Sequence, residues 1–128
     1  MSSAQPWAQA IAVAVGAAGG GVLRWGTGWW LNARWAGFPL GTLVVNCVGG
    51  VCIGIALAWF ERTPNELWRA LWVTGVLGGL TTFSAFSGES LVMLQRGQWG
   101  LALLHTLAHV VGGLGCAALG YLAAQALL

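Results

Sequence analysis

Four long apolar segments dominate the chain. They cover residues 7–30, 40–60, 67–94 and 99–128, and short polar connections separate them. A helix needs about 20 apolar residues to cross the hydrocarbon core of a bilayer. A membrane barrel would instead alternate apolar and polar residues over about 10 positions, and these segments are apolar on every side. We therefore predict an all-α integral membrane protein in which residues 1–128 form a single domain of four transmembrane helices.

The third segment is expected to break near its middle. Gly78 and Gly79 weaken a helix, and the hydroxyls of Thr81 and Thr82 compete for backbone hydrogen bonds. A broken span frees backbone carbonyls that can hold a small cation.

Glycines four residues apart recur in three of the segments. Small residues at this spacing let helix backbones approach closely, so we interpret these glycines as packing positions. The pairs are Gly16 with Gly20, Gly50 with Gly54, and Gly75 with Gly79.

Composition agrees with a lipid environment. Hydrophobic residues make up 58% of the chain and charged residues only 6%, against roughly 25% charged residues in soluble domains. The nine tryptophans suit membrane interfaces. The chain has no lysine and a net charge of +2, so no basic cluster exists for nucleic acid. The cysteines Cys47, Cys52 and Cys116 lie in apolar stretches, where we expect packing roles rather than disulfides.

The chain carries a weak orientation signal. Residues 1–6 have no basic side chain and the first apolar segment is long, so we interpret it as a retained span and not a signal peptide. With four spans, Arg62 and Arg69 fall on one side and Arg34 and Arg96 on the other, which has three arginines if Arg24 is counted. Positive residues normally favour cytoplasmic loops. The even division predicts insertion in both orientations and pairing as an antiparallel dimer.

Polar residues inside membrane segments are costly and indicate function. Asn46 either cross-links helices or donates to an anion. Glu89 either relays protons, accepts from hydroxyls at a pore mouth, or reaches the interface near Arg96. His105 and His109 share one helix face at a spacing that can ligate a metal. No carboxylate or cysteine lies near them in sequence, so we favour packing hydrogen bonds or a polar track.

Aromatic and hydroxyl residues follow the expected break. Phe83 and Phe86 share a face, with Ser84 and Ser87 on a neighbouring one. Phenylalanine rings have positive edges, so ring edges, hydroxyls and an amide can together replace the water shell of a small anion. The sequence contains no nucleophile–base pair, phosphate loop or acid dyad, so we do not expect an enzyme.

These residues together resemble the Fluc/CrcB family of bacterial fluoride ion channels. The resemblance covers essentially the whole length. It rests on Leu23-Arg24-Trp25, on Gly41-Thr42-Leu43-Val44-Val45-Asn46, and above all on Gly78-Gly79-Leu80-Thr81-Thr82-Phe83-Ser84-Ala85-Phe86-Ser87 followed by Glu89. It implies an antiparallel, dual-topology homodimer in the bacterial cytoplasmic (inner) membrane. Two pores, each lined by both subunits, would export fluoride passively.

The resemblance also assigns roles to residues. It implies that Asn46 is a pore-lining amide, that Phe83 and Phe86 offer ring edges to fluoride, and that Thr82, Ser84 and Glu89 lie near the polar track or its entrance. Backbone carbonyls of Gly78 and Thr81 would hold one structural sodium ion on the dimer axis. His105, His109 and Gly113 stand where the family has hydroxyls on the fourth helix. Gly113 has no hydroxyl, so we expect an altered track there.

Two other functions fit parts of the sequence. A small four-helix multidrug/proton antiporter would match the size and the weak charge bias, but the first segment lacks the glutamate that such transporters share. A non-conducting assembly subunit would use the glycine faces, but it leaves Asn46 and the broken third segment unexplained.

Overall fold

The structure is a computed structural model that describes residues 5–35 and 37–128. Its helices are α1 (Pro6–Leu31), α2 (Leu40–Arg62), α3 (Glu66–Arg69), η1 (Ala70–Leu77), α4 (Gly78–Leu80), α5 (Phe83–Gln95) and α6 (Trp99–Leu127). α3 to α5 follow one another as the third span, so four helical segments are long and apolar enough to cross a membrane. The prediction of four spans is confirmed, with bounds within two residues of those expected.

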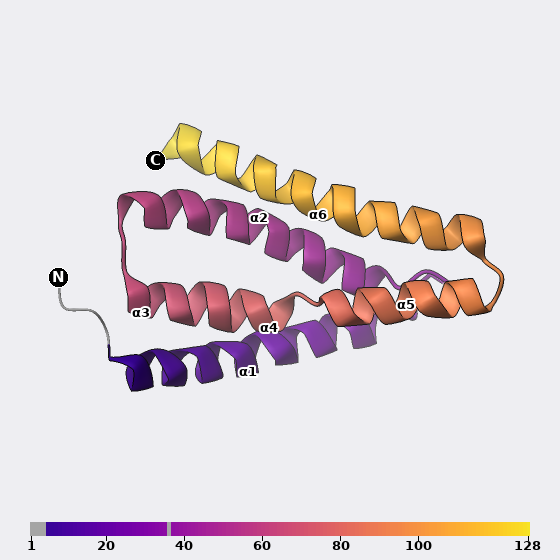
Figure 1. The fold of residues 1–128 in the computed structure, drawn as a ribbon, viewed down its shortest axis with the longest axis horizontal. Coiled ribbons are helices and arrows are strands. Elements are labelled where there is room, and N and C mark those ends of the chain that lie inside the picture. The colour runs from indigo at the N-terminus through magenta and orange to yellow at the C-terminus, as the bar shows by residue number, and fades with distance from the viewer. Residues whose placement is uncertain (1–4, 36) are drawn as a thin grey trace.

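The four spans run back and forth side by side (Figure 1). The start of α1, the α2–α3 connection and the end of α6 lie at one end of the molecule, and the α1–α2 and α5–α6 connections lie at the other. α2 packs along α6, while α1 packs along η1 and α4. Beyond α4, α5 packs against α6, so the third span contacts different neighbours before and after its interruption.

Glycine pairs mark the tightest helix crossings, as predicted. A Cβ atom added to Gly75 would lie 3.0 Å from the Cα of Gly16, and one added to Gly79 would lie 2.6 Å from the carbonyl oxygen of Ala17. A Cβ atom on Gly50 would lie 2.8 Å from the carbonyl oxygen of Gly113 on α6. Real side chains do not fit at these distances, so glycine allows the backbones of α1 and η1, and of α2 and α6, to touch.

The third span is broken where the sequence predicts. α4 ends at Leu80, and Thr81 (φ −86°, ψ 156°) and Thr82 (φ −153°, ψ 119°) are extended before α5 begins at Phe83. The Thr82 hydroxyl caps α5 by accepting a hydrogen bond from the Ala85 N–H at 3.1 Å. The segment before the break, η1, is a π-helix of eight residues. Nothing in the sequence predicted this second irregularity.

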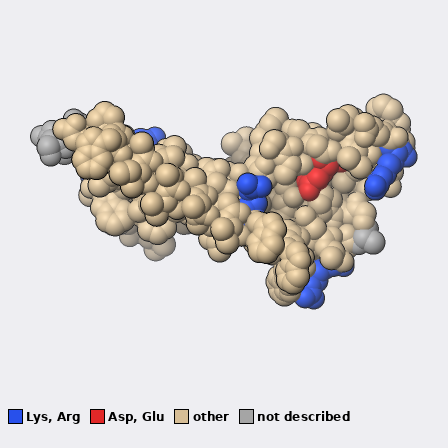
Figure 2. Space-filling view, turned by 90° about the horizontal axis from the view of Figure 1, so that it is seen from below, with Lys and Arg blue, Asp and Glu red and all other residues tan. Residues whose placement is uncertain are grey.

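The outer surface is apolar. Large hydrophobic side chains are exposed along the spans, among them Trp29 at 74% and Leu114 at 72%. Figure 2 shows a face with few, separate charged side chains, one of them acidic and set in a hollow. Such a surface belongs against lipid, so the chain is a multi-pass membrane protein. Its three cysteines are unpaired, in agreement with the packing role expected for them.

Candidate functional site

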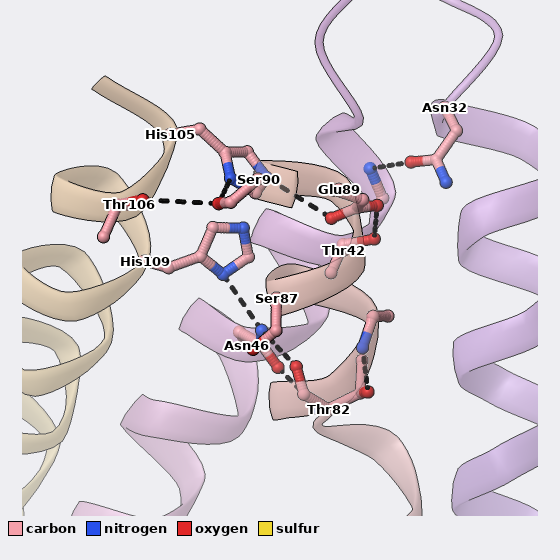
Figure 3. Close-up of polar contacts among 12 residues, drawn as sticks. Asn32, Thr42, Asn46, Thr82, Ser87, Glu89, Ser90, His105, Thr106 and His109 are labelled. Carbon is pink, nitrogen blue, oxygen red and sulfur yellow. Dashed lines mark hydrogen bonds and ion pairs between the residues drawn. The ribbon is translucent and has the colours of Figure 1, made fainter. Parts of the chain in front are cut away.

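Asn46 on α2 holds the break in the third span. Its side-chain oxygen accepts a hydrogen bond from the Thr82 N–H at 2.8 Å, and its amide nitrogen donates to the Thr82 carbonyl at 3.0 Å (Figure 3). These two bonds satisfy the backbone groups that the break exposes. The cross-linking role considered for Asn46 is therefore present in the structure.

The same amide fixes the protonation of His109 on α6. The second N–H of the Asn46 amide points to His109 Nδ1 at 3.0 Å. Since pairing with Thr82 determines which atom of Asn46 is nitrogen, His109 Nδ1 must accept. A neutral His109 then carries its proton on Nε2, which is buried and has no hydrogen-bond partner among the described residues. His109 therefore presents a spare N–H donor inside the helix bundle.

Glu89 on α5 joins a second set of polar side chains. One carboxylate oxygen accepts a hydrogen bond from the Thr42 hydroxyl at 2.6 Å, and the other lies 3.3 Å from His105 Nε2. His105 is fully buried, and its Nδ1 lies 2.8 Å from the Ser90 hydroxyl, which in turn lies 3.3 Å from the Thr106 hydroxyl. Of the three roles considered for Glu89 from the sequence, these contacts match the acceptance of a hydrogen bond from a hydroxyl.

An aromatic stack joins the two sets. The Phe86 ring stacks on His109 with centroids 4.6 Å apart and on His105 at 5.5 Å. Phe83 meets Phe86 edge-on at 5.4 Å, so the two phenylalanines do share a face as predicted. Their surroundings differ, however: Phe86 is 7% exposed and Phe83 is 78% exposed. Phe83 therefore projects from the protein while Phe86 belongs to its interior.

Cavities lie beside this cluster. One of about 460 Å³ is lined by Asn46, Phe83, Phe86, His109 and Gly113, among others. Another, of about 490 Å³, is lined by Arg24, Thr42, Thr82 and Glu89. Ser84 is exposed and lies 3.2 Å from the Thr82 hydroxyl. The predicted side-chain site residues thus line these cavities or, like Ser84 and His105, contact a residue that does.

The break also removes the helical hydrogen-bond donors of the Gly78 and Thr81 carbonyls. In a continuous helix they would accept from the N–H groups of Thr82 and Ala85. Here both N–H groups donate to side-chain oxygens, of Asn46 and Thr82 respectively. Arg24 on α1 donates from Nε to the neighbouring carbonyl of Gly79 at 3.0 Å.

Sequence reasoning missed several members of the site. Ser90 and Thr106 were not singled out, although a hydroxyl within a span is a signal, and Thr42 was noted only as part of a motif. No carboxylate lies near the histidines along the sequence, but in space α5 brings Glu89 to within 3.3 Å of His105.

The fold and this site define a class: a four-span helical membrane protein with hydrogen-bonded polar side chains between its helices. A family model described as CrcB-like protein, Camphor Resistance (CrcB), matches residues 11–121. The chain belongs to this CrcB-like family.

Relatives in the family have a stated activity. The fluoride-specific ion channel FluC of Marinobacter nauticus is 50% identical over 118 residues, which cover 91% of this chain and 94% of that protein. The fluoride-specific ion channels FluC of Aromatoleum aromaticum (47% identity, 88% of each chain) and Cupriavidus pinatubonensis (50%, 86% of this chain and 89% of that one) are similar to it as well. These relatives are ion channels and neither enzymes nor drug antiporters.

Proposed function

We propose that this protein is a fluoride-selective channel through which fluoride leaves a bacterial cell passively across the cytoplasmic membrane. The observation that carries the proposal is the row of polar side chains from Asn46 to His109, across the ring contact to His105, and on to Glu89. It lies in a membrane protein 50% identical to a fluoride-specific channel. Polar groups inside a span persist when they serve a function.

These polar side chains offer hydrogen-bond donors that can replace the water molecules fluoride loses on dehydration. Fluoride needs hydrogen-bond donors, and His109 Nε2–H is a buried donor with no partner among the residues described. Hydroxyls of Thr82 and Ser84 lie beside the exposed ring of Phe83, whose edge is positive. None of these groups carries a fixed positive charge, so fluoride is stabilised but still released, as conduction requires.

We infer that two copies assemble as an antiparallel, dual-topology homodimer with two pores. A phenylalanine that is 78% exposed beside a cavity is poorly placed to guide an anion unless another surface covers it. A second copy in the opposite orientation would cover Phe83, so that Phe83 would line a pore between the two subunits. The even division of Arg62 and Arg69 against Arg34 and Arg96 supports insertion in both orientations.

A structural sodium ion at the dimer axis completes the proposal. The carbonyls of Gly78 and Thr81 have lost their helical donors, and hard cations bind oxygen ligands of this kind. One such pair from each subunit would give four oxygens. The proposal of a sodium site rests on these free carbonyl oxygens at the break.

The test is fluoride efflux from liposomes that contain purified protein, followed with a fluoride electrode and repeated with chloride. We expect rapid fluoride release and negligible chloride release. Phe60→Ile on α2 is the matched control for Phe83→Ile: only the second change should slow efflux. No fluoride release from folded, dimeric protein would overturn the proposal and direct tests to drug–proton exchange.

A further inference from the structure

Glu89, His105 and His109 bring three buried ligand atoms close together inside the helix bundle. Each residue places one ligand atom within 4.8 Å of those of the other two. Glu89 Oε1 and His105 Nε2 are buried and pair with each other at 3.3 Å, and His109 Nε2 is buried and lacks a hydrogen-bond partner among the described residues. Buried polar atoms are nearly always paired, so the unpartnered His109 Nε2 beside this pair points to a bound species.

We propose that Glu89, His105 and His109 form a binding site for a divalent transition-metal ion, Zn²⁺ above all, and that a bound ion blocks fluoride movement. Two imidazoles and one carboxylate are a known zinc ligand set that leaves a fourth position open for water. Imidazole also favours Co²⁺, Ni²⁺ and Cu²⁺ over Mg²⁺ or Ca²⁺, which prefer all-oxygen sites. The metal-binding part of the proposal is independent of fluoride; the blocking part rests on the proposed function.

The distances are close to those of a tetrahedral site. Zinc bonds of about 2.0–2.2 Å place neighbouring ligand atoms roughly 3.4 Å apart. Glu89 Oε1 and His105 Nε2 are already 3.3 Å apart. The remaining atom, from His109, has to move by little more than about 1 Å, since all three lie within 4.8 Å of one another. In Figure 3 the ring of His109 lies next to that of His105, on the side where Glu89 reaches in.

Hydrogen bonds already orient two of the ligands. A metal-bound histidine donates its other ring N–H to a nearby acceptor, and a ligating carboxylate is itself hydrogen-bonded. With a metal on Nε2, His105 Nδ1–H would donate to the Ser90 hydroxyl, 2.8 Å away. The Thr42 hydroxyl donates to Glu89 Oε2 at 2.6 Å and leaves Oε1 for the metal. Glu89 and His105 are therefore the stronger pair.

His109 is the weaker third ligand, because of Asn46. A neutral imidazole that binds metal through Nε2 carries its proton on Nδ1. That proton would face the Asn46 amide N–H, which now donates to Nδ1 at 3.0 Å. Metal binding must displace this contact, so loss of His109 should weaken the site less than loss of His105.

The residues of the site line several cavities. Glu89 lines cavities of about 530 and 490 Å³, and His109 lines the cavity of about 460 Å³. An ion can reach the cluster from the cavities beside Glu89, whose side chain is 21% exposed. Once bound there, a divalent ion would separate the cavity that contains Phe83 from those on the other side.

The experiment measures metal binding directly. The protein is purified as the detergent-solubilised assembly without a polyhistidine tag, in a background with Cys47, Cys52 and Cys116 changed to alanine, because thiolates also bind zinc. The probes are CoCl₂, read by visible absorption, and ZnCl₂, read by equilibrium dialysis. We expect one equivalent per chain. Affinity should fall at least about 100-fold in His105→Ala and Glu89→Gln and roughly 10-fold in His109→Ala, the scale of ligand-shell changes.

Glu61→Gln is the matched control, since Glu61 is paired with Tyr121 and Gln125 far along the chain from the cluster. It should bind metal as the parent does. His105→Gln replaces His105→Ala where the alanine variant does not fold. Parent-like affinity in the His105 and Glu89 variants would overturn the site.

Efflux assays separate this inference from the proposed function. Zn²⁺ should stop fluoride efflux by the parent over the same concentration range in which it binds to the protein. Efflux unaffected by saturating Zn²⁺ would overturn the blocking role. Absence of efflux in metal-free parent protein would overturn the proposed function while the measured binding still supports the site.

Discussion

The side chain of Asn46 and the backbone of Thr82 form two hydrogen bonds with each other, of 2.8 and 3.0 Å. An amide is the side chain suited to this pairing, because it presents a donor and an acceptor side by side as a peptide group does. A residue on α2 thereby replaces the helical partners that the third span lacks at its break. The break is thus stabilised by a tertiary contact between α2 and the third span.

Asn46→Ala should destabilise the protein and abolish fluoride efflux. It leaves the Thr82 N–H and carbonyl without partners, at a cost of about 1–3 kcal/mol for each buried group. Thermal unfolding in detergent and the efflux assay measure the two effects. Asn65→Ala removes only the cap of α3, where the Asn65 side chain accepts from the Trp68 N–H at 3.0 Å. It should cost about 1 kcal/mol and leave efflux intact; equal effects of both changes would contradict the role given to Asn46.

The two phenylalanines should respond differently to truncation. Phe86→Ala removes a buried ring that packs on both histidines, and we expect a loss of about 3–5 kcal/mol. Phe83→Ala removes an exposed ring, so stability should change far less while efflux falls. Unfolding and efflux measured on the same preparations test this. A Phe83 variant with parent-like efflux would remove that ring from the proposed pore.

Gly16→Ala should be destabilising and Gly19→Ala harmless. A Cβ atom on Gly16 would collide with the carbonyl oxygen of Leu71, whereas one on Gly19 meets no atom within 4 Å. Overpacking of this kind costs about 1–3 kcal/mol, and alanine in open space favours the helix. The two variants lie on the same helix and differ only in what they face. Unfolding curves that coincide would show that the α1–η1 contact is looser than described.

Removal of sodium should weaken the proposed dimer. If the carbonyls of Gly78 and Thr81 bind sodium, exchange into N-methyl-D-glucamine buffer leaves them without a partner. We expect slower efflux and a greater monomer fraction in detergent by light scattering, both reversed when sodium returns. Unchanged assembly and efflux after thorough exchange would argue against a bound sodium ion.

Much of the fold followed from local rules. Span length and apolarity predicted the four helices, glycine spacing predicted the crossings, and Gly78-Gly79 with Thr81-Thr82 predicted the break. These features depend on neighbours in sequence or on one helix face. The π-helix η1 did not follow, since Ala70–Leu77 contains no breaker beyond a single glycine.

The sequence predicted which residues belong to the site, but it did not predict which of them contact one another. Asn46, Glu89, His105 and His109 stood out because each is polar inside a span. Which of them pair depends on how α5 and α2 are rotated against α6, and spacing along one helix cannot give that rotation. The sequence therefore left the role of Asn46 open and gave no contact between Glu89 and the histidines. In the packed structure Asn46 contacts His109, and Glu89 contacts His105.

The π-helix η1 has a consequence for how the third span tolerates length variation. In a π-helix each N–H donates five residues back instead of four, so the same axial distance holds more residues than in an α-helix. A one-residue deletion within Ala70–Leu77 can therefore be absorbed by a return to α-helical winding, with Thr81 and Thr82 kept at the same depth. A deletion in α5 has no such surplus and would turn Phe86 and Glu89 away from α6. Insertions and deletions that preserve the channel should accordingly concentrate in η1.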